Sequence, residues 1–282
     1  MLAVPFAALL YGELYHGAGV AFLAESLVRV VLASVSLFLI HSGSQSLNMS
    51  EDAHMDEQTD HKSDRPIPSG RVSREGARSL AWMTVLGGLA LAFAVTTVFG
   101  TFAVVLAGFG IWYNLGPIRA KEVLWLNLVW QATSRGLLLY PTAFAVFGDP
   151  FDPVAWGLGA VAFLLVLSMQ NTADFSDVET DGKFGVTTPA VYHGLRTLVA
   201  IMAVIAVVMF LALSVLIYLD VLPTLWALAL LALPIFWSLW NLWTGPNDVS
   251  SLGGNHSSWY VYYLCLASMY VLPPLQLLAL RP

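Results

Sequence analysis

The chain has 282 residues, of which 58% are hydrophobic and only 11% are charged. Soluble domains contain about 25% charged residues, so this composition excludes a soluble globular protein. The apolar content also excludes a disordered chain. A single cysteine, Cys265, excludes a disulfide scaffold and a cysteine-built zinc site. The composition therefore predicts an all-α polytopic membrane protein.

A membrane-spanning helix needs about 20 mostly apolar residues. Several segments approach this length, and we expect a single domain over residues 1–282, a bundle of about nine transmembrane helices around a central lipid-facing cavity. Little more than Phe99-Gly100 separates the third segment from the short fourth one, which predicts a tight helical hairpin. No cleavable signal peptide is expected at the first segment. The expected spans are 3–22, 27–47, 79–98, 100–114, 123–147, 154–172, 197–219, 221–243 and 258–279.

Lys and Arg are concentrated in the connections after the second, fourth and sixth spans, whereas the opposite connections contain almost none. Because connections rich in Lys and Arg stay in the cytoplasm, we expect these connections and the N-terminus to be cytoplasmic. Most of the acidic residues lie on the same face, chiefly in the connections 48–78 and 172–196. This face is therefore where we expect the polar chemistry of the protein.

A row of oxygen-bearing side chains closes the second span. Asn48, Asp52 and Asp56 are spaced i, i+4, i+8, which places them on one stripe of a helix. Such a row is either solvated or binds a hard divalent cation. Mg²⁺ prefers oxygen ligands and typically joins one or two carboxylates to substrate phosphates.

The segment from Asp64 to Arg71 follows this row and contains two prolines and a glycine. Because proline does not continue a helix, we expect a loop of defined shape. Arg65 and Arg71 lie within reach of the acidic row. The loop is either an ordinary connection with cytoplasmic positive charges or a preformed loop that brings guanidinium groups to an anion.

A second acidic row ends the sixth span. Asp174, Asp177 and Asp181 are spaced i, i+3, i+7, which would place them on a narrower stripe if the segment is helical. Like charges at this spacing destabilise a helix by a few tenths of a kcal/mol per pair. Two acidic rows on one face favour bound cations that bridge a diphosphate over solvation alone.

At these residues the chain resembles the UbiA superfamily of intramembrane prenyltransferases. Members have the motif N-x-x-x-D-x-x-x-D, then a D-R-P-I-P-S-G-R loop, and later D-x-x-D-x-x-x-D; the two acidic rows and residues 64–71 match them. The chain departs from the pattern at Met49, where many members have Asp, and by about two extra residues before the loop. Tyr113 is followed by Arg119 and Lys121 instead of the common Y-x-x-x-K, which leaves open which of the three contacts the diphosphate.

The resemblance implies Mg²⁺-dependent transfer of an isoprenyl group from an allylic diphosphate, such as geranylgeranyl diphosphate, to a lipophilic acceptor. The acceptor is an aromatic quinone precursor or a glycerol-phosphate lipid, diphosphate is released, and no nucleic acid is involved. The implied Mg²⁺ ligands are Asn48, Asp52, Asp56, Asp174, Asp177 and Asp181. The implied diphosphate-binding residues are Arg65, Arg71, Tyr113, Arg119 and Lys121.

Arg135 lies inside the fifth expected span, in the segment Thr133-Ser-Arg-Gly136. An arginine within a membrane is costly and usually faces a cavity or a carboxylate. We hypothesise that it lines the cavity and meets an acidic row or an acceptor anion. Alternatively, the span starts later and Arg135 extends to the membrane surface.

Two other functions are considered. A membrane terpene cyclase of the same fold, in which the allylic cation attacks its own chain, fits the same motifs. A cation transporter predicts acidic residues near the middle of the membrane on interrupted helices. Here the acidic residues lie at the ends of the spans, which disfavours transport.

Overall fold

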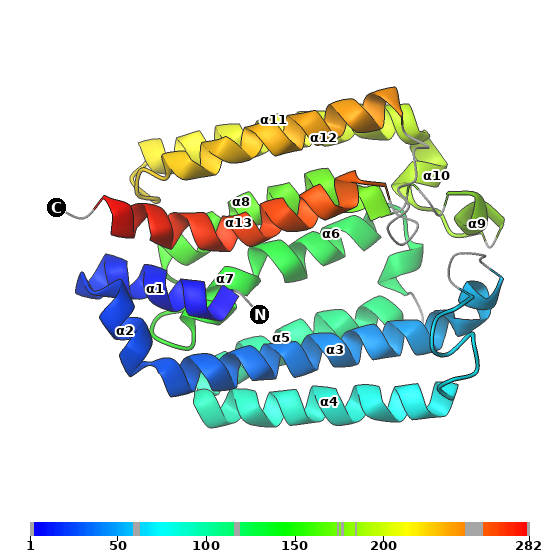
Figure 1. Cartoon of the computed structure of the whole chain (residues 1–282), viewed down its shortest axis with the longest axis horizontal. Helices are drawn as coiled ribbons and strands as arrows, with labels where there is room; N and C mark the ends of the chain where they lie inside the picture. The colour runs from blue at the N-terminus through cyan, green and yellow to red at the C-terminus, as the bar shows by residue number, and fades with distance from the viewer. Residues whose placement is uncertain are drawn as a thin grey trace.

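The computed structural model describes residues 3–58, 63–115, 119–173, 175, 178–183, 185–245 and 256–280. Long helices run along one axis of the molecule, and residues 63–73, 178–183 and 185–194 lie at one end of it (Figure 1). Seven helical segments in the described ranges are long and apolar enough to cross a membrane. The predicted all-α architecture is confirmed, and the expected count of about nine spans is approximate. The seven are Leu27–Glu57 (α3), Arg74–Val95 (α4), Thr97–Asn114 (α5), Pro153–Thr172 (α8 with the start of a 3₁₀ turn), Leu195–Tyr218 (α11), Trp226–Thr244 (a 3₁₀ turn and α12) and Ser258–Ala279 (α13).

The first expected span, 3–22, is wrong as a single helix. Helix α1 covers Ala3–His16 and helix α2 covers Gly19–Glu25. Gly17 between them has φ +58°, a left-handed conformation that ends a helix. At 1.5 Å per residue, the 14 residues of α1 span about 21 Å, less than the ~30 Å hydrocarbon core.

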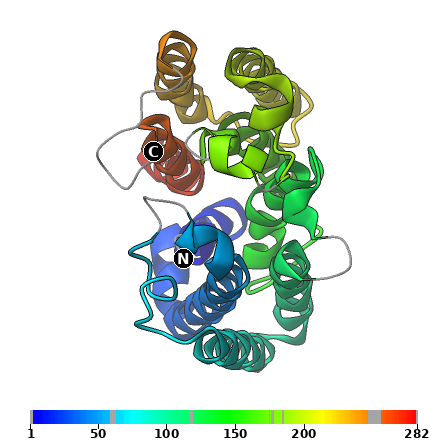
Figure 2. The same cartoon turned by 90° about the vertical axis from the view of Figure 1, so that its right-hand side faces the viewer.

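Helices α3, α4 and α5 form one side of the bundle (Figure 2). The predicted hairpin between α4 and α5 is present. Thr96 is extended, and its hydroxyl accepts a hydrogen bond of 3.0 Å from the backbone N–H of Phe99, which caps α5. Ser36 on α3 donates a hydrogen bond of 2.7 Å to the carbonyl of Gly88 on α4, so the two helix backbones lie close together.

We expect Gly88→Ala to destabilise the protein by about 1–3 kcal/mol, the usual cost of overpacking. A Cβ on Gly88 would lie 2.8 Å from the carbonyl oxygen of Ser36, whereas one on the adjacent Gly87 would meet nothing within 4 Å. Gly87→Ala is therefore the matched control, and its better helix propensity makes it neutral or slightly stabilising. Melting temperatures in detergent check the pair, and equal values for both variants would contradict the close contact.

The fifth expected span, 123–147, is interrupted. It consists of α6 (Leu126–Ala132), a π-helical segment (Thr133–Leu137) and α7 (Leu139–Phe144). The π-helical segment packs tightly against α8. A Cβ on Gly136 would lie 2.5 Å from the backbone nitrogen of Phe163, and one on Gly159 would collide with the carbonyl oxygen of Leu137. These two glycines allow the interrupted helix to press against α8.

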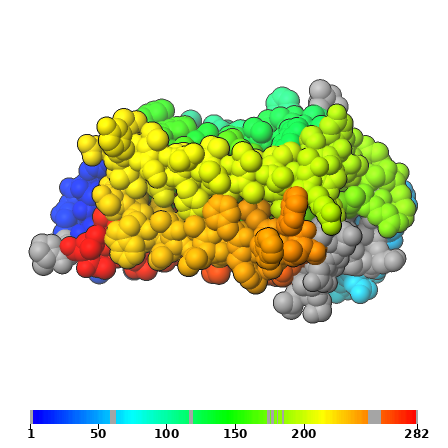
Figure 3. Space-filling view, turned by 90° about the horizontal axis from the view of Figure 1, so that it is seen from above, coloured from blue at the N-terminus to red at the C-terminus, as the bar shows by residue number. Residues whose placement is uncertain are grey.

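Helices α11 and α12 (Ala232–Thr244) lie side by side along one face of the molecule (Figure 3). Their outer surface is apolar and includes exposed Val204, Leu211, Leu233, Trp237 and Trp240. This composition suits contact with lipid chains. The two helices thus form an outer wall, and α8 and α13 lie between this wall and helices α3 and α5 (Figure 2).

Candidate functional site

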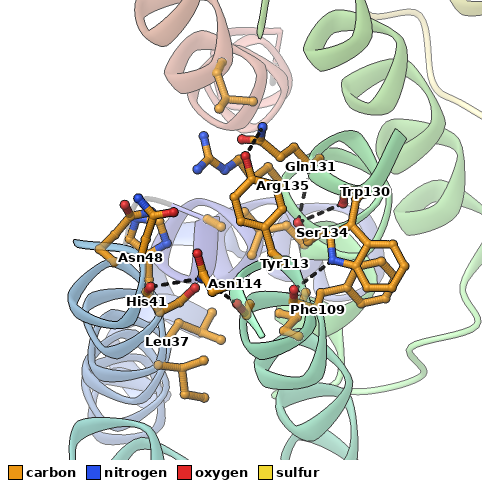
Figure 4. Close-up of a pocket in the computed structure, with 18 of the residues that line it drawn as sticks. Leu37, His41, Asn48, Phe109, Tyr113, Asn114, Trp130, Gln131, Ser134 and Arg135 are labelled. Carbon is orange, nitrogen blue, oxygen red and sulfur yellow. Dashed lines mark hydrogen bonds between the residues drawn. The ribbon is translucent and has the colours of Figure 1, made fainter. Parts of the chain in front are cut away.

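A cavity of about 500 Å³ lies among α3, α5, α6, the π-helical segment and α13. Its walls include apolar side chains such as Leu37, Leu106, Phe109 and Leu266. Polar side chains enter it from two directions. In Figure 4, His41 and Asn48 on α3 face Gln131 and Arg135, with Tyr113 and Asn114 of α5 between them. The cavity therefore combines an apolar interior with a small number of polar groups.

The first acidic row is helical, because α3 continues to Glu57. Asp52 Oδ1 lies 2.5 Å from Lys121 Nζ and 3.1 Å from Arg119 Nη2. Lys121 Nζ also lies 3.3 Å from the side-chain oxygen of Asn48. The structure thus brings two cations from the α5–α6 connection to the end of α3, 67 and 69 residues away in sequence.

Lys121 is mostly covered, with 11% of its side chain exposed. Burial lowers the pKa of Lys121 from its ordinary value, and the neighbouring Asp52 carboxylate opposes that shift by favouring the ammonium form. Arg119 Nε donates a hydrogen bond of 2.9 Å to the carbonyl of Asn114, and this bond orients the guanidinium of Arg119. Both cations are therefore held at this position, one by burial and the other by a backbone hydrogen bond.

Tyr113 has a different setting from Arg119 and Lys121. Its hydroxyl donates a hydrogen bond of 3.0 Å to Asn127 Oδ1 and accepts one of 3.1 Å from Gln131 Nε2. Tyr113 lines the cavity itself, whereas Arg119 and Lys121 contact Asp52 just outside it, next to Asn48 and Asn114 at its polar end. Of the three residues left open by the sequence, Arg119 and Lys121 thus lie closest to the acidic row.

The two arginines of the 64–71 loop have different environments. Arg65 Nη1 lies 2.8 Å from Asp56 Oδ2, and that carboxylate is 5% exposed. Arg71 is exposed; its Nε donates 2.9 Å to Ser69 Oγ and its Nη2 donates to the carbonyl of Asp64. The structure therefore brings Arg65 to the first acidic row but leaves Arg71 bound within its own loop.

The second acidic row lies partly outside the described residues, since Asp174 and Asp177 are not among them. Asp181 is in α9 (Val178–Lys183) and is 6% exposed. The expectation of one helical stripe is wrong. Among the described residues, Gln170–Ala173 forms a 3₁₀ turn, Phe175 lies in a turn and α9 covers Val178–Lys183, so no single helix runs through Phe175.

The donor set fits a hard divalent cation. Within the described ranges no group of three His, Cys, Asp or Glu side chains forms a metal cluster, and two of the six expected ligands lie outside those ranges. Asn171, just before the second row, is fully buried, and its side-chain oxygen has no hydrogen-bond partner. A buried oxygen without a partner is costly, and together with the carboxylates of α3 it is the ligand type that Mg²⁺ prefers.

Arg135 projects from the π-helical segment into the cavity (Figure 4). Its Nη1 donates a hydrogen bond of 3.2 Å to Gln170 Oε1. Its backbone carbonyl accepts a hydrogen bond of 3.2 Å from the hydroxyl of Tyr270 on α13. Arg135 therefore lies inside the bundle and does not extend to the membrane surface.

Sequence reasoning missed several polar residues of the cavity wall. Four polar residues of α3 line the cavity and follow one another at i, i+3, i+4 and i+7: His41, Ser44, Gln45 and Asn48. Polar residues at this spacing inside an apolar span mark one helix face. The signal was present in the sequence, but the acidic row beyond it is the stronger feature.

The sequence profile of the UbiA prenyltransferase family matches residues 8–253. The chain belongs to this family. The resemblance found in the motifs is thereby confirmed. Membership of the UbiA family, together with the seven apolar helical segments, makes the chain an integral, multi-pass membrane protein.

Characterised members of the UbiA family differ in their acceptors. Digeranylgeranylglyceryl phosphate synthase of Methanoculleus marisnigri is 30% identical over 167 residues, 59% of this chain and 57% of that protein. Protoheme IX farnesyltransferase of Korarchaeum cryptofilum is 37% identical over 188 residues, 55% of this chain and 63% of that protein. 4-Hydroxybenzoate octaprenyltransferase of Aliivibrio fischeri is 23% identical over 175 residues, which cover 61% of this chain and 60% of that protein. The matches thus span less than two thirds of these relatives.

Solved UbiA structures share the fold over nearly the whole chain. The apo UbiA homolog from Aeropyrum pernix K1 has a TM-score of 0.70 at 18% identity, covering 99% of this chain and 96% of that one. The UbiA homolog from Archaeoglobus fulgidus bound to DMAPP and Mg²⁺ has a TM-score of 0.69 at 17% identity, covering 99% and 95%. At these identities the comparison establishes the UbiA fold.

Proposed function

We propose that this protein is a Mg²⁺-dependent prenyltransferase that moves an isoprenyl group from an allylic diphosphate to a lipophilic acceptor and releases diphosphate. The observation that carries the proposal is the convergence of Lys121 and Arg119 on Asp52 at the polar end of an apolar cavity. An isoprenyl diphosphate has the same two-part character, with a charged head and an apolar tail. The named UbiA relatives and the substrate-bound homolog support this reading.

The expected Mg²⁺ ligands are Asn48, Asp52 and Asp56 of α3, with Asp174, Asp177 and Asp181 from the second row. Bound Mg²⁺ would neutralise charge on the diphosphate and assist its departure. Cations balance two of the α3 carboxylates: Lys121 and Arg119 contact Asp52, and Arg65 contacts Asp56.

The chain's own side chains have two tasks in the transfer. Lys121 and Arg119 donate hydrogen bonds to diphosphate oxygens, whose negative charge grows as the C–O bond breaks; such preorganised donors lower the barrier. The apolar wall with Phe109 and Trp130 excludes water from the allylic cation, and the aromatic faces stabilise its charge. The acceptor then attacks the same carbon.

We also propose that residues 1–282 form one catalytic domain whose motif connections and N-terminus face the cytoplasm. Arg65, Arg74, Arg78, Arg119 and Lys121 gather around the end of α3, at Glu51, Asp52 and Asp56. The positive-inside rule assigns such an end to the cytoplasm. The carboxylates lie in the last turns of α3 rather than at mid-helix, which favours catalysis over cation transport.

The test uses purified protein in lipid nanodiscs with Mg²⁺ and geranylgeranyl diphosphate. Diphosphate release is measured with and without 4-hydroxybenzoate, geranylgeranylglyceryl phosphate or protoheme IX. We expect release that requires an acceptor, stops on chelation of Mg²⁺ and resumes when Mg²⁺ is restored. A cyclic product formed without an acceptor would indicate a terpene cyclase instead, and no release from diphosphates of any chain length would refute both.

A further inference from the structure

Arg135 places a positive charge in the cavity that no carboxylate among the described residues neutralises. Its guanidinium donates a hydrogen bond of 3.2 Å to the amide oxygen of Gln170 and also interacts with the hydroxyl of Tyr262 on α13. A guanidinium has five N–H donors, so these two neutral partners leave donors for another group and do not neutralise its charge. A charged side chain inside the membrane-spanning part of a protein costs free energy, and such a residue usually has a function.

The backbone around Arg135 is fixed on two sides. Gly136 presses against the backbone of Phe163 on α8, and Tyr270 on α13 donates to the carbonyl of Arg135. The segment is π-helical, a form that often occurs at functional sites. Arg135 is therefore held in its inward position by packing, with no acidic partner to explain it.

Arg135 is separate from the cation pair at the polar end of the cavity. Arg135 and His41 both line the cavity. His41 precedes Asn48 by seven residues and Asp52 by eleven, or about 10 and 16 Å along α3 at 1.5 Å per residue. A diphosphate bound at Asp52 is served by Lys121 and Arg119, which leaves Arg135 for a second anion deeper in the cavity.

We propose that Arg135, oriented by Gln170, binds the anionic group of the acceptor, a carboxylate or a phosphate. This inference rests on the proposed prenyl transfer and specifies its acceptor class. Guanidinium pairs with both groups through two parallel hydrogen bonds. An acid such as 4-hydroxybenzoate or a glycerol phosphate lipid fits the site, whereas a neutral polyene leaves the charge of Arg135 without a partner.

Direct binding measurements in nanodiscs test the charge preference with matched probes. The pairs are 4-hydroxybenzoate against 4-hydroxybenzamide, and geranylgeranylglyceryl phosphate against geranylgeranylglycerol. In the unmodified protein we expect the acid of one pair to bind more tightly than its neutral partner. In Arg135→Gln we expect that acid to lose about 10- to 100-fold in affinity, the value of a hydrogen-bonded charge pair. Its neutral partner should change less than about twofold.

Controls separate this site from the rest of the protein. Arg29→Gln removes an exposed arginine at the start of α3 and should leave both affinities unchanged. Arg135→Lys keeps the charge but not the paired geometry, so it should retain part of the preference. If Arg135→Gln folds poorly, the acid-to-neutral affinity ratio within Arg135→Lys still reports on the site, because the folded fraction cancels.

Several results would overturn the assignment. One is equal affinity for acid and neutral partner of both pairs in the unmodified protein. Another is an equal loss for both members of a pair in Arg135→Gln. A third is a comparable loss of affinity for geranylgeranyl diphosphate, which would assign Arg135 to the leaving group. Failure of the proposed function itself has a separate readout, since it appears as absent diphosphate release in the unmodified protein.

Discussion

Asp52→Asn is expected to lower the rate of diphosphate release by about 10²–10³-fold, the loss typical of removing one group that stabilises transition-state charge. Asp52 is the α3 carboxylate that both cations of the α5–α6 connection contact. Asparagine keeps the size and one oxygen but removes the negative charge. The substitution therefore weakens a proposed Mg²⁺ ligand and leaves the mostly buried Lys121 without its counterion.

The neighbouring Glu51 provides the matched control. It pairs with Arg74 at 3.4 Å and with Arg78 at 2.5 Å, both on α4, and does not contact Lys121 or Arg119. Because the two arginines are about half exposed, these ion pairs contribute about 1 kcal/mol or less each. Glu51→Gln should therefore keep diphosphate release within about twofold of the unmodified rate, since it removes two weak ion pairs that involve neither Lys121 nor Arg119.

Steady-state rates at several Mg²⁺ concentrations check this pair of variants. A rise in the apparent Mg²⁺ requirement of Asp52→Asn supports a role in holding the metal. Melting temperatures of both variants separate a lost ligand from a lost fold. Undiminished release by a well-folded Asp52→Asn would contradict the assignment of the α3 row.

The first acidic row was predictable because its geometry is local. The i, i+4, i+8 spacing of Asn48, Asp52 and Asp56 fixes one stripe once the segment is helical, and α3 continues through it. The second row was not, because the described Phe175, between Asp174 and Asp181 in the sequence, lies in a turn. Periodicity relates residues only within one continuous element, so it could not place Asp174 relative to Asp181.

The partners of the first row are a tertiary property. Lys121 reaches Asp52 from a 3₁₀ turn 69 residues later, and that turn does not follow the common family spacing. Likewise Arg71, which the loop motif suggested for the site, bonds to the loop itself. Charge and motif located the polar face, but the pairing of particular side chains depends on how α3 and α5 pack.

The interrupted fifth span shows the same limit. Its apolar composition predicted one helix over 123–147, and the π-helical segment has no periodic signature in the sequence. What determines it is packing, because Gly136 of the π-helical segment and Gly159 of α8 carry no side chains where the two elements meet. Close approach of two backbones is decided by both helices together, so neither sequence segment reveals it alone.

Gly136→Ala is expected to destabilise the protein by about 3 kcal/mol, at the upper end of the range for overpacking. The new Cβ would lie 2.5–2.7 Å from three backbone atoms of Ala162 and Phe163. Backbone atoms of a packed helix do not rotate away as a flexible side chain does. The π-helical segment must therefore move off α8 and carry Arg135 with it.

Gly108→Ala is the control, because a Cβ on this glycine of α5 would meet nothing within 4 Å. We expect it to melt at or slightly above the temperature of the unmodified protein. Gly136→Ala should melt clearly lower and, in its folded fraction, lose the preference for an acidic over a neutral probe. A Gly136→Ala variant as stable as Gly108→Ala would contradict the close packing on α8. A stable variant with its acid preference intact would show that the position of Arg135 does not depend on this contact.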